Sequence, residues 1–344
     1  MRAELRVIEA RLRAPFVSAS QALSARRLVL VRLLAADGAS GYGEAAPLDS
    51  YDGVTVDHVC AALDRCRPAL RDSEGEDRPG LLAACAARAQ LPQALAAIDL
   101  ALWDLAGRRA GQPVWRLLGA AAPAPLAVNA TIAAADRASA AAAAAAARAA
   151  GFGCLKIKVG IGDDAGRLAA VRAAAGPETK IRLDANGAWS APEATALLRA
   201  LEPEDIELCE EPTAGLEQIV RVATATPVPL ALDESATVSG ALERRACEAV
   251  CLKLSAWGGI SGLLAAARRA RRAGYRIYLA STLDGPLGIA AALHAAAVVR
   301  PDYACGLATL PLFAAREDSL APRGGRMAVP NGPGLGAGLL DWYR

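Results

Sequence analysis

The chain has 344 residues, a net charge of +2 from 38 lysines and arginines against 36 aspartates and glutamates, and a hydrophobic content of 54% that alanine inflates. This length allows one large domain or two, with a large buried core. The charge balance argues against a nucleic-acid partner or an anionic membrane surface. No apolar run reaches the roughly 18 uninterrupted residues of a membrane span.

Cysteine and histidine usage narrows the possible chemistry. The eight cysteines form no Cys-x-x-Cys pair and several lie in apolar runs, so we expect buried free thiols in a reducing cytoplasm. The N-terminal residues alternate like a strand and lack the apolar core of a signal peptide, which also favours a cytoplasmic location. His58 and His294 are the only histidines, and each is more often structural, so we expect carboxylates and lysines to carry the chemistry.

The first part of the chain predicts an α+β domain of residues 1–123. Residues 5–13 and 26–34 are typical of strands. Residues 91–111 carry apolar side chains at helical spacing, and Gly111 is a helix stop signal.

From residue 124 to 317 the pattern changes to short β-rich runs separated by room for a helix, at a period of about 25 residues. This alternation favours an α/β fold, a modified (β/α) barrel of the TIM type, although the segment is shorter than a complete barrel. The tail, residues 318–344, adds no ninth unit and is expected to return to the first domain. The runs are PLAVNATI, CLKIKVG, KIRLDANG, IELCEEP, PLALDES, AVCLKLS, RIYLAST and YACGLAT.

Polar residues follow successive predicted strands at the ends where barrel enzymes place their active sites. Consecutive members are 26, 26, 23 and 20 residues apart, about one βα unit each, so they become neighbours around the barrel mouth. The predicted cluster is three adjacent carboxylates with a lysine on either side. In chain order its members are Lys158, Asp184, Glu210, Asp233 and Lys253.

The composition of this cluster predicts its chemistry. Three carboxylates that face one cavity repel each other, and a hard divalent cation relieves the repulsion; Mg²⁺ suits oxygen ligands, with Mn²⁺ as an alternative. The period of a strand puts Lys156 and Lys158 on one face, and like charge together with the metal should lower a lysine pKa from about 10.4 towards neutrality. Such a lysine serves as a general base. The predicted task is proton abstraction next to the carboxylate of a small-molecule substrate, with the metal stabilising the enediolate.

Two other interpretations compete with this one. A single acid or lysine at a strand end is usually an exposed charge or a helix cap, but five consecutive strand ends in this order favour an active site. A barrel kept for binding without catalysis is the alternative from another class of protein. The intact set of acids and lysines argues against it.

Five motifs resemble the enolase superfamily, specifically its muconate-lactonising subgroup. The resemblance covers nearly the whole chain, because GYGEAAPL and ALWDLAGRRAGQPVWRLLG resemble the capping domain of that family and PNGPGLG its C-terminal return. The motifs are KIK (156–158), LDANGAW (183–189), CEEP (209–212), LDES (232–235) and LKLSAWGGI (252–260).

The resemblance implies a role for each residue of the cluster. Asp184, Glu210 and Asp233 would be the Mg²⁺ ligands, and Lys158 and Lys253 would flank the substrate. The histidine base of the mandelate racemase branch has no counterpart here. Residues expected to support the ligands and the bases are Lys156, Asn186, Glu211 and Glu234.

The substrate is harder to predict. Capping loops at residues 15–20 and 51–53 are expected to cover the site. Dipeptide epimerases of the subgroup carry an Asp-x-Asp motif at the eighth strand to hold an ammonium group, and the absence of acids from YACGLATLPLF (303–313) argues against that branch. This run also departs from the Glu-Leu-Phe-Gly-Pro pattern of muconate-lactonising enzymes. The expected substrate contacts are Tyr51, Ser281, Thr282 and Gly306.

CGLATLPLF and STLDGPLGIAAALHAAA resemble the o-succinylbenzoate synthase group, which works in menaquinone synthesis. This likeness implies a lyase in which Lys158 removes a proton, hydroxide leaves and Lys253 stabilises the anion. An isomerase stays open as the alternative, either an N-succinylamino acid racemase or epimerase or a muconate-type cycloisomerase. A homo-oligomer is expected, because barrels of this family commonly associate.

Overall fold

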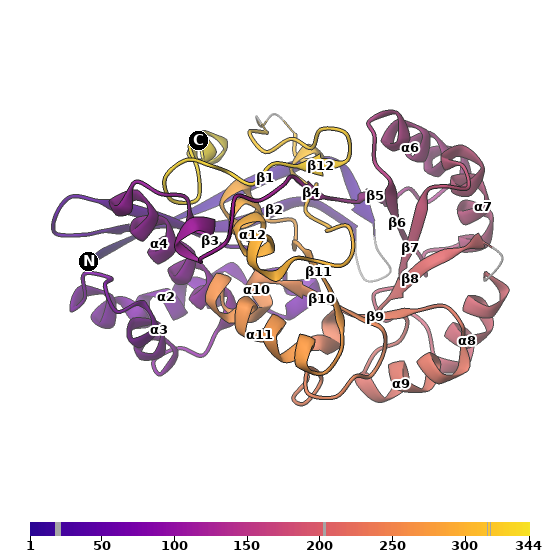
Figure 1. Cartoon of the computed structure of the whole chain (residues 1–344), viewed down its shortest axis with the longest axis horizontal. Coiled ribbons are helices and arrows are strands. Elements are labelled where there is room, and N and C mark those ends of the chain that lie inside the picture. Colours follow the sequence, from indigo (N-terminus) through magenta and orange to yellow (C-terminus); the bar gives the residue numbers. More distant parts are fainter. Residues whose placement is uncertain (18–21, 202–203, 315, 317) are drawn as a thin grey trace.

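The computed structural model describes residues 1–17, 22–201, 204–314, 316 and 318–344. The N-terminal part pairs a long antiparallel hairpin with a third strand and covers the sheet with helices (Figure 1). The predicted strands and the predicted helix are confirmed here. The elements are β1 (Arg2–Val17), β2 (Ala22–Leu34), β3 (Ser40–Ala45), α1 (Asp49–Asp52), α2 (Val56–Arg71), α3 (Arg78–Ala86), α4 (Pro92–Ala110) and α5 (Val114–Leu117).

Helix α4 ends where its sequence predicts. Gly111 caps it in the left-handed conformation, with φ of 62°, which a glycine adopts without the steric cost of a Cβ. The helix packs directly on β3, and Gly43 of that strand leaves no room for a side chain: an added Cβ would lie 2.0 Å from the carbonyl oxygen of Ala97. This close approach fixes α4 against the sheet.

The second part is a curled parallel sheet with helices around it, as the alternating pattern predicts (Figure 1). Its strands are β5 (Ala130–Ile132), β6 (Cys154–Lys158), β7 (Lys180–Asp184), β8 (Ile206–Glu210), β9 (Leu230–Leu232), β10 (Ala249–Lys253) and β11 (Arg276–Ala280), hydrogen-bonded in this order. Its helices are α6 (Arg137–Ala149), α7 (Asp164–Ala175), α8 (Ala191–Ala200), α9 (Leu216–Ala225), α10 (Leu254–Trp257), α11 (Ile260–Arg272) and α12 (Pro286–Val299).

The barrel departs from eight regular units in two places. Between β9 and β10 the described residues form the short 3-10 helix η2 (Glu234–Thr237) in place of an α-helix. The eighth run forms no full strand, but Cys305 and Gly306 bridge both edges of the sheet. The amide of Gly306 donates to the carbonyl of Leu279 (2.8 Å), and the amide of Asn129 donates to the carbonyl of Cys305 (3.0 Å). Backbone hydrogen bonds therefore close the ring.

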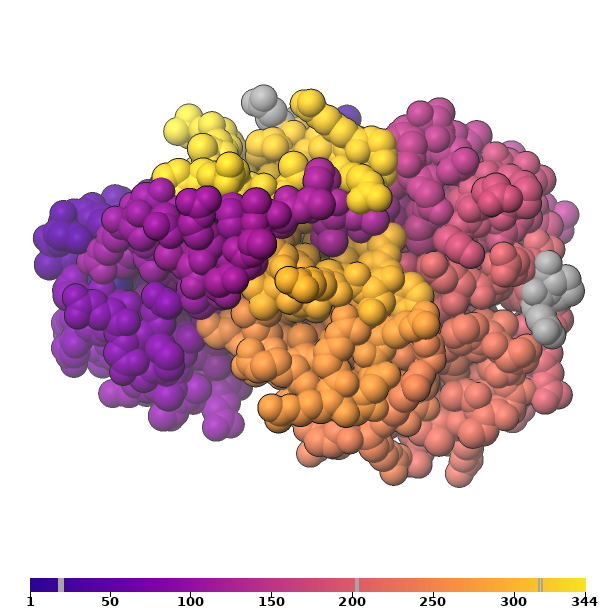
Figure 2. Space-filling model, viewed as in Figure 1, coloured from indigo at the N-terminus to yellow at the C-terminus, as the bar shows by residue number. Residues whose placement is uncertain are grey.

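The C-terminal residues contact both parts of the molecule. Strand β12 (Arg326–Met327) pairs with β4 (Leu126–Ala127), and the amide of Gly334 donates to the carbonyl of Gln112 (2.9 Å). Figure 2 shows these yellow residues lying over the purple N-terminal part. The domain division, with boundaries at residues 123 and 317 and a C-terminal return, stays a prediction.

Helix α12 joins the barrel to the N-terminal part. Its residues 286–296 are buried, and it packs against α5, β3 and α11. His294 accepts a hydrogen bond from the amide of Trp115 (3.2 Å), and its other ring nitrogen lies 3.2 Å from the carbonyl of Leu335. All eight cysteines are free of disulfides, and none of the described helices is long and apolar enough to cross a membrane.

Candidate active site

The strand register brings the predicted cluster together. Lys158 on β6 lies opposite Asp184 on β7, and Asp184 lies opposite Glu210 on β8, so the spacing of 26 residues is one step around the sheet. Asp233 directly follows β9, and Lys253 is the last residue of β10. All five side chains are buried.

Two lysines lie on one side of the cluster. The Nζ of Lys156 donates to both carboxylate oxygens of Glu210 (2.7 and 2.8 Å) and forms an ion pair with Asp184 (2.7 Å). The Nζ of Lys158 donates to Asp184 (2.6 Å) and to the side-chain oxygen of Asn186 (2.7 Å). The two lysines share the inner face of β6, as the strand period predicts.

The third lysine has a different set of partners. The Nζ of Lys253 forms an ion pair with Asp233 and donates to the hydroxyl of Tyr51 (3.1 Å). That hydroxyl in turn donates to the other carboxylate oxygen of Asp233 (2.9 Å). Tyr51 therefore brings the N-terminal part of the chain to the mouth of the barrel.

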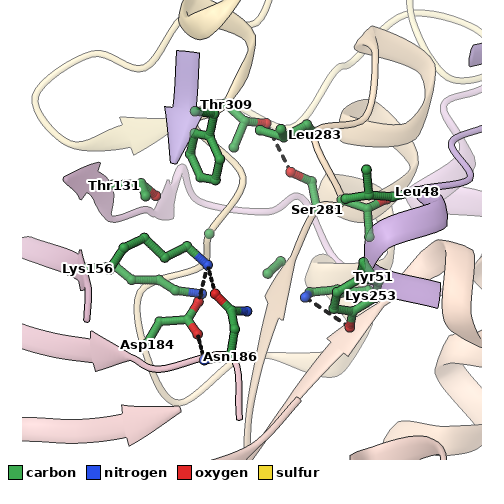
Figure 3. A pocket seen from close by; sticks show the side chains of 15 residues that line it. Leu48, Tyr51, Thr131, Lys156, Asp184, Asn186, Lys253, Ser281, Leu283 and Thr309 are labelled. Atoms are coloured by element: carbon green, nitrogen blue, oxygen red, sulfur yellow. Dashed lines mark hydrogen bonds and ion pairs between the residues drawn. The ribbon is translucent and has the colours of Figure 1, made fainter. Parts of the chain in front are cut away.

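One pocket lies between these lysines. Figure 3 shows Asp184 and Asn186, the two partners of Lys158, across the pocket from Lys253 and Tyr51. Lys158 and Lys253 therefore reach the pocket from opposite sides. A small molecule held between them would have the amino group of one lysine near each of its two faces.

The four expected substrate contacts all line this pocket. The hydroxyls of Ser281 and Thr309 lie 2.9 Å apart on one wall (Figure 3). The hydroxyl of Thr282 donates to the buried Asp284 (2.7 Å), so its proton is not available to a bound molecule. Gly306 lies in the segment that closes the barrel.

Several lining residues were missed by sequence reasoning. Apolar side chains come from the first strand, from the loop before α1 and from the loop after β11. Residues 15–17 of the predicted capping loop form the end of β1, and its residues 18–20 lie outside the described chain. Leu48, Leu283 and Thr309 lie within the runs GYGEAAPL, STLDGPLGIAAALHAAA and CGLATLPLF, but nothing in those runs distinguishes them as pocket residues. The missed residues are Leu48, Thr131, Ala280, Leu283 and Thr309, whereas Phe16 falls within the predicted capping loop of residues 15–20.

The predicted supporting carboxylates hold the backbone around the ligands. Glu211 accepts hydrogen bonds from the amides of Asp233 (2.8 Å) and Ser235 (3.1 Å), which fixes the chain after β9. Glu234 accepts from the side-chain amide of Asn186 (3.1 Å). Asn186 and Glu211 adopt left-handed backbone conformations, with φ of 45° and 39°, an uncommon state that clusters at functional sites.

The donor set fits a hard divalent cation. Glu210, Asp233 and Cys251 offer ligand atoms within 4.8 Å of one another, and Asp184 lies one strand away. Burial, together with the charges of Asp184 and Asp233, raises the pKa of Glu210 to about 7. A cation with oxygen ligands would favour the charged form of these neighbouring carboxylates, whereas burial holds the Cys251 thiol pKa well above its usual value and keeps it protonated.

The expected lowering of a lysine pKa is not found in this arrangement. Burial alone would lower the pKa of Lys253, but the charge of Asp233 outweighs it and holds that pKa well above its usual value. Asp184 and Glu210 likewise raise the pKa of Lys156 against the effect of burial. The prediction considered like charges and a metal, and omitted the direct ion pairs to the carboxylates.

Two inward-facing residues below the cluster were also missed. The hydroxyl of Tyr278 donates to Glu210 (2.7 Å), and Cys251 lies beside Tyr278 in the paired strands β10 and β11. Counting back two residues from Lys253 would have placed Cys251 on the inner face. The hydrogen bond from Tyr278 fixes the orientation of the Glu210 carboxylate.

Comparisons with known proteins agree with this architecture. A D-Ala-D/L-Ala epimerase of Cytophaga hutchinsonii is 30% identical over 352 residues, 97% of this chain and 94% of that protein. An o-succinylbenzoate synthase of Thermobifida fusca is 34% identical over 191 residues, 52% of this chain and 59% of that protein. The crystal structure of a dipeptide epimerase from Cytophaga hutchinsonii, complexed with Mg and the dipeptide D-Ala-L-Val, has a TM-score of 0.89 at 29% identity, covering 98% of this chain and 95% of that one.

Two family models cover nearly the whole chain. Residues 2–119 match the N-terminal domain of the mandelate racemase / muconate lactonizing enzyme family. Residues 138–341 match the enolase C-terminal domain-like family. The chain is therefore an enzyme of the enolase superfamily and belongs to the subgroup of the muconate-lactonising enzymes.

Proposed function

We propose that this enzyme inverts the configuration of a carbon next to a carboxylate, as a racemase or epimerase of a small carboxylic acid, with Mg²⁺ as its metal. One observation carries the proposal: Lys158 and Lys253 line one pocket, and Asp184 and Asn186, the partners of Lys158, lie across it from Lys253 (Figure 3). The comparisons favour this isomerase alternative over dehydration to o-succinylbenzoate, because an epimerase aligns over 97% of the chain and the synthase over 52%.

Two bases on opposite sides of one carbon are what inversion requires. In the neutral form, one lysine removes the proton from its face of the substrate, and the other lysine, as an ammonium, delivers a proton to the opposite face. The roles exchange for the other enantiomer. A single base would return the proton to the face it came from.

The acids of the cluster would hold the cation. Asp184, Glu210 and Asp233 are the proposed Mg²⁺ ligands, and the bound ion would neutralise charge that develops on the substrate carboxylate. The lysines keep neutral hydrogen-bond partners besides these acids, namely Asn186 for Lys158 and Tyr51 for Lys253. These partners fix the direction of each Nζ.

Deuterium exchange in D₂O with Mg²⁺ tests the proposal, using a panel of single-enantiomer N-acylated amino acids and dipeptides. We expect deuterium at the carbon next to the carboxylate together with accumulation of the opposite configuration. Aromatisation of the cyclohexadiene precursor of o-succinylbenzoate, without inversion of any acid, would instead support the synthase activity. A cytoplasmic location, a homo-oligomer and Mn²⁺ as an alternative metal stay predictions.

A further inference from the structure

We infer that the part of the substrate beyond the reacting carbon carries no charge, so that the enzyme takes amino acids whose nitrogen bears a neutral acyl group. This inference rests on the proposed function and names its substrate class. It excludes two other classes: substrates with a free ammonium group, and substrates with a second carboxylate.

The first step is the distribution of charge around the pocket. Among the described lining residues, the charged side chains are Lys156, Lys158, Asp184 and Lys253. They are the two proposed bases, one proposed metal ligand and the supporting lysine beside it. The other lining residues are apolar, carry a hydroxyl or are glycine.

An ammonium group finds no free acid among the described lining residues, and Glu234, which is not one of them, accepts from the side-chain amide of Asn186. Asp184 pairs with two lysines, and Asp233 pairs with the third. The nearby Asp284 lies behind the wall, where it is buried and accepts hydrogen bonds from the amide and hydroxyl of Thr282. A cation placed among three lysines, where the lining carboxylate is already paired, would lose its hydration and meet like charge.

A second carboxylate finds no free cation. No arginine is among the described lining residues. The buried guanidinium of Arg26 donates to the carbonyls of Ala46 (3.1 Å) and Pro47 (2.7 Å), and that of Arg167 donates to the carbonyl of Lys158 (2.9 Å), so both are used by the backbone. The hydrogen bonds of Arg26 hold the backbone that presents Leu48 to the pocket. The lysines of the pocket are used by the reacting carboxylate and by the carbon next to it.

The wall of the pocket suits an amide. Two hydroxyls 2.9 Å apart, those of Ser281 and Thr309, hold two protons and use one of them in their mutual hydrogen bond. The second proton is available to the carbonyl oxygen of an acyl group. Phe16, Leu48 and Leu283 offer apolar surface for the remainder of that group.

Equilibrium binding tests the inference independently of turnover. The Lys158→Ala variant, loaded with Mg²⁺, is titrated by calorimetry with N-acetyl, N-succinyl and glycyl derivatives of the same amino acids. We expect the acetyl compounds to bind at least about tenfold more tightly than the glycyl and succinyl compounds, because the latter bring an unpaired charge. Equal or tighter binding of either charged series, or no binding of the acetyl compounds, overturns the inference.

Turnover separates the two proposals. If the acetyl compounds bind best and the wild-type enzyme inverts none of them, the proposed reaction fails while the inference about charge stands. If the wild-type enzyme inverts the glycyl dipeptides with the highest kcat/KM, the reaction stands and the inference fails.

Substitutions in the wall locate the acyl group. Thr309→Val keeps the shape and removes the hydroxyl, and we expect about tenfold weaker binding of the acetyl compounds. Thr309→Asp adds a carboxylate and should shift the preference towards the glycyl compounds, whereas the matched uncharged variant Thr309→Asn should not. An unchanged ranking in a folded Thr309→Asp protein would contradict this location.

Discussion

The hydroxyl of Tyr51, from the N-terminal part, lies 3.1 Å from the Nζ of Lys253 in the barrel, and the centre of its ring lies 4.1 Å from the same atom. The two residues are 202 positions apart in the chain. The helix that carries Tyr51, α1, is only four residues long and includes the start of the predicted capping loop of residues 51–53. The N-terminal part therefore orients one of the two proposed bases.

Removal of this hydroxyl should impair one direction of the reaction more than the other. In Tyr51→Phe the ring still covers Lys253, but the hydrogen bond to its Nζ is lost. We expect kcat to fall about tenfold, with little change in KM, for the enantiomer whose proton faces Lys253. Separate kcat and KM values for the two enantiomers measure this effect. Tyr42→Phe, on β3 away from the pocket, is the control, and an equal loss for both enantiomers would argue against an orienting role.

Mg²⁺ should stabilise the folded protein through the acid cluster. At one hundred times its dissociation constant, a ligand that binds only the folded state adds about 2.7 kcal/mol to the free energy of unfolding. We expect a rise in Tm on titration with Mg²⁺, and loss of most of this rise in Glu210→Gln. The control Glu217→Gln changes an exposed acid on α9 and should respond like the wild type. The same Mg²⁺ response in all three proteins would remove Glu210 from the proposed ligands.

His294 should make the protein sensitive to acid. Burial lowers its pKa from 6.5 to about 4, so between these pH values the unfolded chain binds a proton that the folded chain does not. The contribution of His294 to the free energy of unfolding is therefore fully present above pH 6.5. It falls as the pH drops towards 4, by about 3 kcal/mol in total, because each unit of pKa difference corresponds to about 1.36 kcal/mol. Urea unfolding at pH 7 and pH 4 measures this loss. The variant His294→Gln should lose less, and an equal loss would assign the acid sensitivity to other groups.

Much of the barrel mouth follows from the sequence for simple geometric reasons. Lys158, Asp184 and Glu210 follow one another at intervals of one βα unit. This spacing places each of them directly opposite the next on a neighbouring parallel strand. The period of two puts Lys156 and Lys158 on one face. These rules are local, so they hold without knowledge of the rest of the molecule.

Contacts between the two parts could not be predicted in this way. The position of Tyr51 over Lys253 depends on how the N-terminal sheet packs on the barrel, which no local pattern encodes. The closure of the ring at Cys305 and Gly306 uses bridges too short for a strand pattern. The raised pKa of Lys253 depends on its ion pair with Asp233, which the strand order alone did not reveal.

The most direct test of the central claim, that Lys158 and Lys253 act on opposite faces of one carbon, is deuterium exchange from each pure enantiomer in the variants Lys158→Ala and Lys253→Ala. Each variant should keep exchange from one enantiomer and lose it from the other by several orders of magnitude, with opposite preferences, and neither should invert configuration. Loss of exchange from the same enantiomer in both variants, or inversion by either one, would contradict the two-base arrangement.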